Sequence, residues 1–202
     1  GVDVVHHIGF GREEIARYGK AGLRLIRLCS PTAPHQHGGK ACEDRSRGKV
    51  PLERAWQKQA GQAMDARLQA ALEKHRGNFG FPIPAGKVAL DADSVKDFKL
   101  LGTILQDAGL EFWCQRTGRG GHFILRSPAL EDVRNSVKRS CDGATYDVRG
   151  IGGQIVVLTH PMVGSYRIDR AELESDGVHA RALIVSRLVT PPAGPGISVE
   201  EV

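Results

Sequence analysis

The alternation of hydrophobic and polar residues is clearest at residues 87–93, where it predicts a strand. Val88 and Leu90 are the apolar members of this alternation, and the run ends in two acidic residues, Asp91 and Asp93. Residues i and i+2 of a strand point to the same face of a sheet. We therefore expect the two carboxyl groups to lie side by side at the mouth of a sheet.

Longer apolar periods and further short apolar runs predict the other elements of the chain. Helical spacing predicts helices over residues 13–18, 52–74, 94–109 and 128–139, and a partly helical segment over residues 171–188. Strands are predicted over residues 23–29, 112–116, 123–125, 144–148, 154–158 and 164–168. Glycine and proline predict a loop over residues 30–51 and a tight connection over residues 77–82. This order favours an α+β fold with a mixed or antiparallel sheet over a βαβαβ nucleotide-binding fold.

The apolar stripes of the predicted helices identify side chains that we expect in the core. Trp56 and Met64 fall on the stripe of the longest predicted helix. Val95 begins the stripe of the helix after the acidic strand, and Val137 belongs to that of residues 128–139. We interpret Trp56 and Met64 as core residues rather than as a binding platform.

Composition places the chain among soluble globular proteins. Its 202 residues are 41% hydrophobic and 25% charged, and no apolar stretch approaches membrane-spanning length. The net charge of +5 and the pI of about 9.2 suit a polyanionic partner. The four cysteines show no disulfide framework and no signal peptide opens the chain, so we expect a cytoplasmic protein with reduced thiols.

Four residues of kinds that bind zinc lie in or beside the 30–51 loop, namely Cys29, His35, His37 and Cys42. Their spacing lacks the paired C-x₂-C arrangement of strong zinc motifs. We therefore favour a flexible surface loop, with a zinc-containing adaptor as the alternative.

The acidic pair at the end of the 87–93 strand has two interpretations. Adjacent carboxylates repel each other unless a proton or a cation lies between them, and Mg²⁺ or Mn²⁺ is the hard ion that oxygen ligands suit. Alternatively, Asp93 is the N-cap of the helix that begins at Ser94.

A glycine-rich turn at residues 117–122 ends in His122. Glycine amides approach a phosphate closely, and Arg119 adds a positive charge. The spacing does not match a Walker motif, and the turn precedes a strand rather than a helix. In the structural alternative, His122 is a polar residue that caps a hairpin.

Four motifs occur in an order that is more informative than any of them alone. They are Leu90-Asp91-Ala92-Asp93, the 117–122 turn, Tyr146-Asp147 with the glycines of residues 150–153, and Gly48-Lys49-Val50-Pro51 with Trp56. Together they resemble the N-terminal primase–polymerase domain of bifunctional replication proteins, a family of the archaeo-eukaryotic primase superfamily. Its acid-x-acid, small-x-His and apolar-Asp motifs match Asp91 and Asp93, Gly120-Gly121-His122, and Tyr146-Asp147. The resemblance spans roughly the 23–29 strand to the 164–168 strand.

The resemblance implies a fold and a set of site residues. The fold is a modified RNA-recognition-type sheet with flanking helices and a smaller α/β module, forming one catalytic domain over residues 1–190 before a linker-like tail at residues 191–202. Two Mg²⁺ or Mn²⁺ ions would be bound by Asp91, Asp93 and Asp147, which with His122 form the catalytic set. The implied nucleotide-binding residues are Thr117, Gly118, Arg119, Gly120, Gly121, His122 and Arg149.

The implied activity is that of a DNA primase or DNA polymerase of a phage, plasmid or integrated element. Its substrates would be NTPs or dNTPs on a single-stranded DNA template with a primer, and a fused or separate helicase is the expected partner. Lys87, Arg116, Arg119 and Arg149 would flank the acids and suit polyphosphate and DNA. The alternatives are a two-metal nuclease and a non-catalytic single-stranded-DNA-binding or replication-initiator module.

Overall fold

The acidic strand predicted from the sequence is β5 (Lys87–Ala92), an inner strand of a six-stranded antiparallel sheet in the computed structural model of the protein. The strand order is β11-β6-β7-β5-β9-β8. The other strands are β6 (Trp113–Arg116), β7 (Gly121–Arg126), β8 (Ser136–Cys141), β9 (Ala144–Arg149) and β11 (Arg167–Ile168). The structure describes residues 11–31, 35–37, 40–43, 46–126, 133–157, 167–168 and 188–189.

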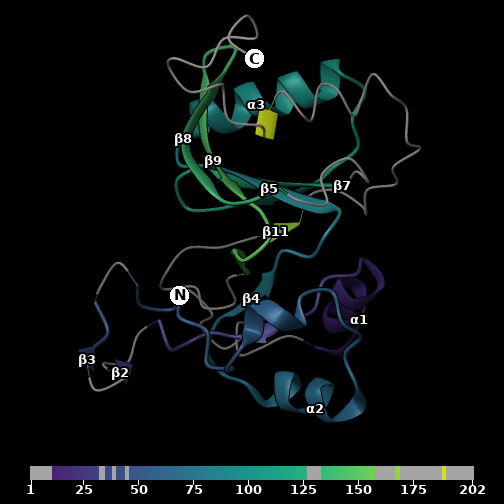
Figure 1. The fold of residues 1–202 in the computed structure, drawn as a ribbon, viewed down its shortest axis with the longest axis vertical. Coiled ribbons are helices and arrows are strands. Elements are labelled where there is room, and N and C mark those ends of the chain that lie inside the picture. Colours follow the sequence, from purple (N-terminus) through teal and green to yellow (C-terminus); the bar gives the residue numbers. More distant parts are fainter. Residues whose placement is uncertain are drawn as a thin grey trace, which may run out of the picture.

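Helix α3 (Val95–Asp107) covers one face of this sheet, as Figure 1 shows. Leu101 and Leu105 are fully buried, and the ring of Phe98 stacks on Phe123 of β7 with centroids 4.7 Å apart. The helix predicted over residues 94–109 is thus confirmed. Val95 was expected in the core but is 42% exposed, because it lies in the first turn, beside the N-cap.

A second, three-stranded sheet with the order β1-β4-β10 forms the lower part of the molecule in Figure 1. Its strands are β1 (Ile26–Arg27), β4 (Phe79–Pro82) and β10 (Gln154–Val157). Helices α1 (Arg12–Lys20) and α2 (Ala66–Lys74) pack against each other beside it. A 3₁₀ helix, η2 (Trp56–Gln59), and a hairpin of β2 (Gln36–His37) and β3 (Lys40–Ala41) complete this part.

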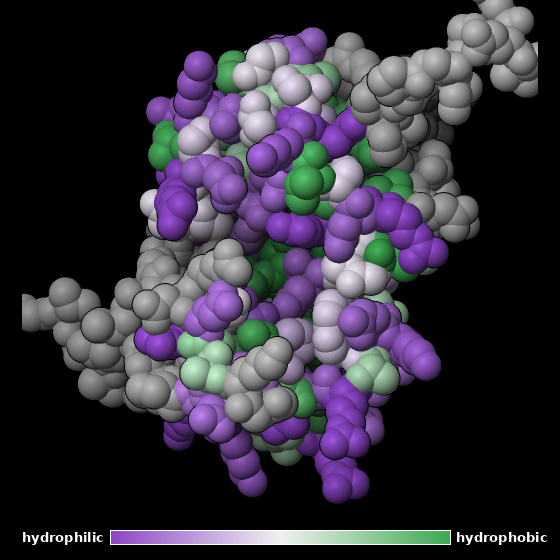
Figure 2. Space-filling model, turned by 60° about the vertical axis from the view of Figure 1, so that its left-hand side comes forward, coloured by the Kyte–Doolittle hydropathy of each residue, from purple (hydrophilic) through white to green (hydrophobic). Residues whose placement is uncertain are grey.

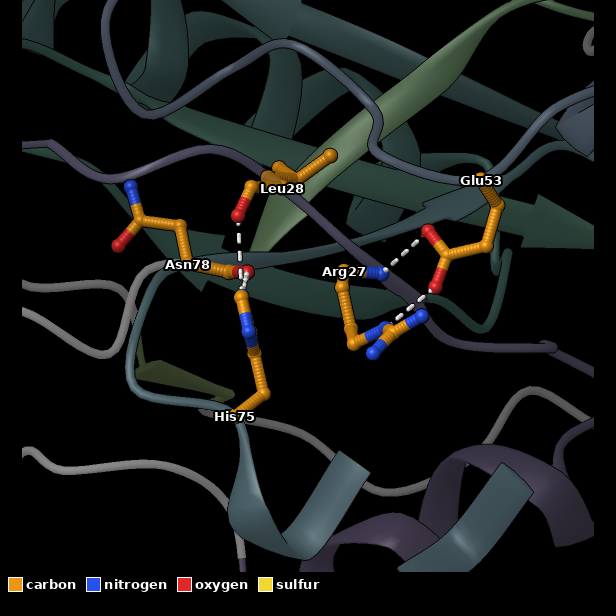
Figure 3. Close-up of polar contacts among 5 residues, drawn as sticks. All are labelled: Arg27, Leu28, Glu53, His75 and Asn78. Carbon is orange, nitrogen blue, oxygen red and sulfur yellow. Dashed lines mark hydrogen bonds and ion pairs between the residues drawn. The ribbon is translucent and has the colours of Figure 1, made fainter. Parts of the chain in front are cut away.

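Polar contacts join the strands and helices of this lower part (Figure 3). His75, which follows α2, places Nε2 2.9 Å from the carbonyl oxygen of Leu28 and 3.0 Å from that of Asn78. Both partners are acceptors, so Nε2 carries the proton. Arg27 donates from its backbone amide and from Nε to the carboxylate of Glu53. These bonds connect the 3₁₀ region and the end of α2 to strands β1 and β4.

The helix predicted over residues 52–74 is wrong in its first half. Only η2 and α2 are helical there, and α3 is the longest helix of the described residues. Gly61 has a left-handed φ of +74°, which interrupts any continuous helix. Asp65 then starts α2 afresh as its N-cap, because its carboxylate accepts a hydrogen bond from the Leu68 amide at 2.8 Å.

The tight connection predicted over residues 77–82 is also wrong, because β4 occupies most of it. All four residues of β4 are buried, and the strand pairs antiparallel with β1 on one side and β10 on the other. Gly80 is required here because a Cβ would contact the Ile155 carbonyl oxygen at 2.9 Å. Pro82, which lacks an amide donor, stands at the end of the strand.

The helix predicted over residues 128–139 is contradicted by strand β8. Residues 136–141 pair with β9 around an irregularity between Ser136 and Arg139, where Lys138 has a left-handed φ of 52°. Val137, expected to point inward, is 61% exposed. Residues 127–132 lie outside the described part of the chain.

Helix α1 confirms the helix predicted over residues 13–18, and β6, β7, β9 and β10 confirm the strands predicted at their positions. Two other strand predictions differ from the structure or extend beyond its described residues. The strand expected over residues 23–29 is reduced to β1 and a bridge from Leu28 to Pro51. Of the strand expected over residues 164–168, the structure describes residues 167–168, which form β11. Apart from Leu188, the partly helical segment 171–188 lies outside the described residues, as does the tail 191–202. The α+β class with antiparallel sheets is confirmed. In the described ranges, no helix has the length and apolar character needed to cross a membrane.

Candidate active site

The two acids of the D-x-D pair occupy different positions at the end of β5. Asp91 lies within the strand, and Asp93 follows it and is exposed. The N-cap of α3 is Ser94, whose Oγ accepts a hydrogen bond from the Asp97 amide at 3.0 Å. The alternative in which Asp93 caps the helix is therefore wrong, and its carboxyl group does not serve the helix N-terminus.

Strand register places Asp91 between two other predicted site residues. It is the direct partner of His122 on β7 and of Asp147 on β9. Direct cross-strand partners share a face of the sheet, with Cβ atoms about 4.5–5.5 Å apart. The His122 Nε2 atom lies 3.3 Å from Asp91 Oδ1. Three residues far apart in the sequence thus form one row across the sheet.

Electrostatics indicate that Asp93 belongs to the same group. Partial desolvation, and then the like charges of Asp91 and Asp147, raise the pKa of Asp93 above 3.8. Arg119 acts in the opposite direction. Strand pairing thus brings Asp91, His122 and Asp147 together, and the charge of Asp93, two residues after Asp91, interacts with those of Asp91 and Asp147.

The pKa of Asp91 is shifted the other way. Burial alone would raise it, but the imidazole of His122 lowers it through a hydrogen bond and a favourable charge. The charges of Arg149 and Lys49 lower it further, so the pKa of Asp91 lies below 3.8. Asp91 is therefore a carboxylate at neutral pH, although it is largely buried.

Two contacts from neighbouring residues fix the carboxylate of Asp147. The backbone amide of Lys138 donates to Oδ1 at 2.9 Å, and Arg149 Nη2 lies 3.4 Å from Oδ2. The amide of Lys138 is available because the β8 irregularity takes it out of the regular ladder. The strand that sequence analysis mistook for a helix thus positions a site residue.

A pocket of about 360 Å³ lies beside this row, between the two sheets. Asp91, His122 and Arg149 line it from the large sheet. Lys49, Trp56 and strand β10 line it from the other side. In Figure 2 the surface is hollowed between the two halves of the molecule, with hydrophilic residues around the hollow.

The sequence pattern did not indicate that Lys49 and Trp56 line a pocket. Trp56 was interpreted as a core residue, but it is only half-buried and faces the pocket from η2. Met64, in contrast, packs against the core as expected. The signal was present, because both pocket residues lie in or near the Gly48-Lys49-Val50-Pro51 motif.

Gln115 is another residue that no sequence motif identified. It is the cross-strand partner of His122 on β6 and is fully buried. Within the described chain, neither its Oε1 nor its Nε2 has a hydrogen-bond partner. Only the strand register, which the sequence does not give, places this amide in the row with Asp91.

The glycine-rich turn is closed on itself. The Gly120 amide donates to Thr117 Oγ1 at 2.9 Å, and the Thr117 amide donates to the Gly120 carbonyl at 3.1 Å. Of residues 117–122, only His122 is among the pocket-lining residues. The nucleotide-binding role of Thr117, Gly118, Arg119, Gly120 and Gly121 stays a prediction.

The four cations expected to flank the acids are not equivalent. Arg149 lines the pocket, and the charge of Arg119 acts on Asp93. Arg116 instead lies over the Phe98 ring, 4.7 Å from its centroid. Lys87 begins β5, four residues before Asp91, which is about 13 Å away along a strand.

Comparison with known proteins agrees with the motif order. The family profile described as "Bifunctional DNA primase/polymerase, N-terminal" matches residues 15–179. Among curated proteins, the carbamoyl phosphate synthase small chain of Archaeoglobus fulgidus is 39% identical over 41 residues. That stretch is 20% of this chain and 12% of the other protein, so it is too short to bear on the function of either whole chain.

Proposed function

Since the chain belongs to the bifunctional DNA primase/polymerase N-terminal family, we propose that it adds nucleotides to a primer strand on a single-stranded DNA template. The observation that carries this proposal is the row in which Asp91 has His122 on one side and Asp147 on the other, beside a pocket. The family implies a primase or polymerase activity, and the row supplies the groups that nucleotidyl transfer needs.

The donor set fits divalent metal ions. Asp91, Asp93 and Asp147 offer only oxygen ligands, and the pKa of Asp93 is raised first by partial burial and then by the like charges of Asp91 and Asp147. We propose that these three residues bind two Mg²⁺ or Mn²⁺ ions. When bound, such ions would activate the primer 3′-hydroxyl and neutralise the pyrophosphate leaving group.

The side chains around the pocket suit a nucleoside triphosphate. Lys49 and Arg149 line opposite sides of the pocket and would present positive charge to the phosphates. His122, held by Asp91 at 3.3 Å, presents an oriented imidazole to the same space. Trp56 offers a ring against which a base or sugar can pack. The pocket volume lies within the usual range for small-molecule sites.

The architecture supports a primase-like fold of the archaeo-eukaryotic type. The large sheet carries α3 on one face and the polar row on the other, as expected of a modified RNA-recognition-type sheet. The three-stranded sheet with α1 and α2 corresponds to the smaller α/β module. A phage, plasmid or integrated-element context and a helicase partner remain part of the proposal through the family resemblance.

The experiment compares primer synthesis and extension by the native protein, Asp91→Asn and Asp147→Asn. Each substitution should lower the rate with Mg²⁺ or Mn²⁺ by at least about a hundredfold, because a carboxylate needed for metal binding is lost. Asp107→Asn is the matched control, since Asp107 is exposed at the far end of α3, about 18 Å along the helix axis from its start.

Two further arms separate this proposal from its rivals. Labelled DNA incubated with Mg²⁺ and no nucleotides should stay intact, whereas cutting that depends on Asp91 would indicate a nuclease. Binding of single-stranded DNA that is unchanged by EDTA, with no nucleotide incorporated by the native protein, would indicate a non-catalytic module. Full activity in Asp91→Asn would overturn the assigned site.

A further inference from the structure

Four side chains of the segment between β1 and the Lys49 motif converge at a point away from the acidic row. The Sγ atoms of Cys29 and Cys42 and one ring nitrogen each of His35 and His37 all lie within 4.8 Å of one another. In a tetrahedral zinc site, ligand atoms lie about 3.3–3.8 Å apart, as bond lengths of about 2.0–2.3 Å require. The cluster is therefore close to the size of a zinc coordination shell.

The β2–β3 hairpin explains how an unusual spacing reaches this geometry. Gln36 pairs with Ala41, and the Cys42 amide donates to the carbonyl oxygen of His35 at 2.9 Å. The hairpin projects from the lower part of the molecule in Figure 1 and returns Cys42 towards Cys29. Sequence spacing argued against zinc because three of the ligands, His35, His37 and Cys42, come from this hairpin and its base rather than from a C-x₂-C turn.

The environment of the four groups suits a metal better than a packing role. Both thiols are buried, and the two imidazole rings contact edge to face with centroids 4.7 Å apart. The Nε2 atom of His37 is buried and has no hydrogen-bond partner among the described residues. The Gly48 amide donates to Cys29 Sγ at 3.2 Å, a bond that stabilises a thiolate. Two thiolates and two imidazoles form a donor set typical of tetrahedral zinc.

We propose that Cys29, His35, His37 and Cys42 bind one structural Zn²⁺ ion. The ion would close the segment from Cys29 to Cys42 into a loop held by metal–ligand bonds, in addition to the pairing of the two-residue strands β2 and β3. This binding site does not depend on the proposed polymerase activity.

The site also has a consequence for the pocket. The Cys29 amide donates to the Val50 carbonyl oxygen at 2.9 Å, and Gly48 contacts Cys29 as described above. Between them lies Lys49, whose carbonyl oxygen accepts a hydrogen bond from Gln154 at 2.8 Å and whose side chain lines the pocket. A zinc ion bound to Cys29 would therefore position Lys49 relative to Asp91. This second step rests on the proposed function.

The first test is the metal content of the native protein, purified without chelators and without a metal-affinity column. We expect about one equivalent of zinc per chain. Replacing the metal with Co²⁺ should give the intense visible absorption of a tetrahedral site with thiolate ligands. Less than about a tenth of an equivalent after zinc addition, with no cobalt spectrum, would overturn the proposal.

Single substitutions test whether the zinc ion binds to these four residues. Cys42→Ser and His37→Gln should each lose zinc, whereas Cys141→Ser should keep it, because Cys141 is a cysteine of the same burial outside the cluster. If Cys42→Ser does not fold, the milder His37→Gln and the native cobalt spectrum still decide the matter. A Cys29–Cys42 disulfide in protein prepared without reductant, with no bound zinc, would contradict the proposal.

A final comparison separates the zinc site from the catalytic proposal. Removing zinc should lower the melting temperature by at least about 5 °C, because the ion binds only the folded chain. It should also weaken nucleotide binding about as much as Lys49→Ala does. A lowered melting temperature with unchanged nucleotide binding would support the zinc site and refute its positioning role, independently of whether the protein extends primers.

Discussion

Glycines at positions 120 and 121 bring the turn before β7 into direct contact with the end of β5. A Cβ on Gly120 would collide with the carbonyl oxygen of Ala92 and lie 2.9 Å from the Ser94 amide. A Cβ on Gly121 would collide with the Phe98 ring. Gly120 therefore allows the close approach of two backbones next to Asp93, and Gly121 allows the Phe98 ring to pack against the start of β7.

Gly120→Ala should impair both folding and catalysis. The end of β5 must shift to admit the methyl group, which we expect to cost about 1–3 kcal/mol of stability. Displacement of Asp93 should lower the primer-extension rate about 10- to 100-fold. Gly102→Ala on α3 is the control, because a Cβ there makes only an ordinary van der Waals contact, 3.4 Å from the Phe123 ring, and Gly102 lies outside the predicted site. Equal stability and activity in the two variants, by denaturant unfolding and primer extension, would contradict this role.

The site residues that belong to recognisable motifs could be predicted from the sequence. The one that depends on which strands pair, and in which register, could not. Asp91, His122 and Asp147 follow short motifs that can be recognised along the chain. Gln115 enters the row only because β6 pairs with β7 in one particular register. A one-residue slip would turn that amide to the other face of the sheet, and no local pattern fixes the pairing.

Helix α3 is tied to the large sheet by the side chain of Asp97. Its Oδ1 accepts a hydrogen bond from the Thr145 amide of β9 at 2.9 Å, and its Oδ2 accepts one from Ser94 Oγ at 2.7 Å. These bonds, with the Thr145 contribution the larger, hold the pKa of Asp97 below 3.8. The N-cap of α3 is thereby coupled to the strand that carries Asp147.

Asp97→Ala should destabilise the protein by about 1–2 kcal/mol at neutral pH, because the Thr145 amide and the cap lose a partner. A carboxyl group with a lowered folded-state pKa stabilises the fold above its unfolded value and loses that contribution as the pH falls. The difference in the free energy of unfolding between Asp97→Ala and the native protein should therefore become smaller below pH 3.8. Urea unfolding at several pH values measures it, and Asp107→Ala on the same helix should show no such deficit.

His75 connects the end of α2 to β1 and β4, and it should make stability depend on pH. Burial lowers the pKa of His75 below its ordinary value of 6.5, although its hydrogen bonds to Leu28 and Asn78 act in the opposite direction. The unfolded chain therefore binds a proton more readily than the folded one, and stability falls as the pH drops below 6.5.

His75→Gln should reduce this pH dependence, because glutamine retains an N–H donor for the two carbonyl groups but does not titrate. The measurement is the free energy of unfolding of both proteins across the range below pH 6.5. We expect the native protein to lose more stability than the variant on acidification. Parallel curves would show that His75 does not cause the acid sensitivity.

Elements with a long, regular spacing of apolar residues could be predicted from the sequence. Elements whose conformation depends on tertiary contacts could not. Helix α3 has an apolar face and a serine cap, both local signals. Strand β4 was mistaken for a turn because its glycine and proline are turn residues by local preference. Burial between β1 and β10 overrides that preference, since the strand receives partners on both sides.

The pocket is a property of the whole molecule, because its walls come from segments distant in the sequence. Lys49 and Trp56 belong to the lower part of the molecule, and Asp91 and His122 belong to the large sheet. Strand β10, which also lines the pocket, comes after all four residues in the sequence. The sequence supplied the chemistry of one wall through the motifs. A motif also marked Lys49 and Trp56, but no sequence pattern placed them opposite the acidic row, because that depends on how the two sheets face each other.

The two tryptophans differ in position, since one lies in the core and the other lines the pocket. This difference allows the pocket to be tested by fluorescence. Trp113 is 4% exposed and its ring packs against Tyr18 with centroids 5.6 Å apart. Trp56 is half-buried and lines the pocket. Because the chain has only these two tryptophans, intrinsic fluorescence has one reporter in the pocket and one in the core.

Adding a nucleoside triphosphate with Mg²⁺ should change the emission of the native protein in a saturable way. Trp113→Phe should keep this change and Trp56→Phe should lose it, because only Trp56 lies beside the proposed nucleotide. Lys49→Ala should raise the half-saturating nucleotide concentration about tenfold or more, since it removes a charged partner of the phosphates. If Trp56→Phe retained the full signal, the nucleotide would have to bind away from the space between the two sheets.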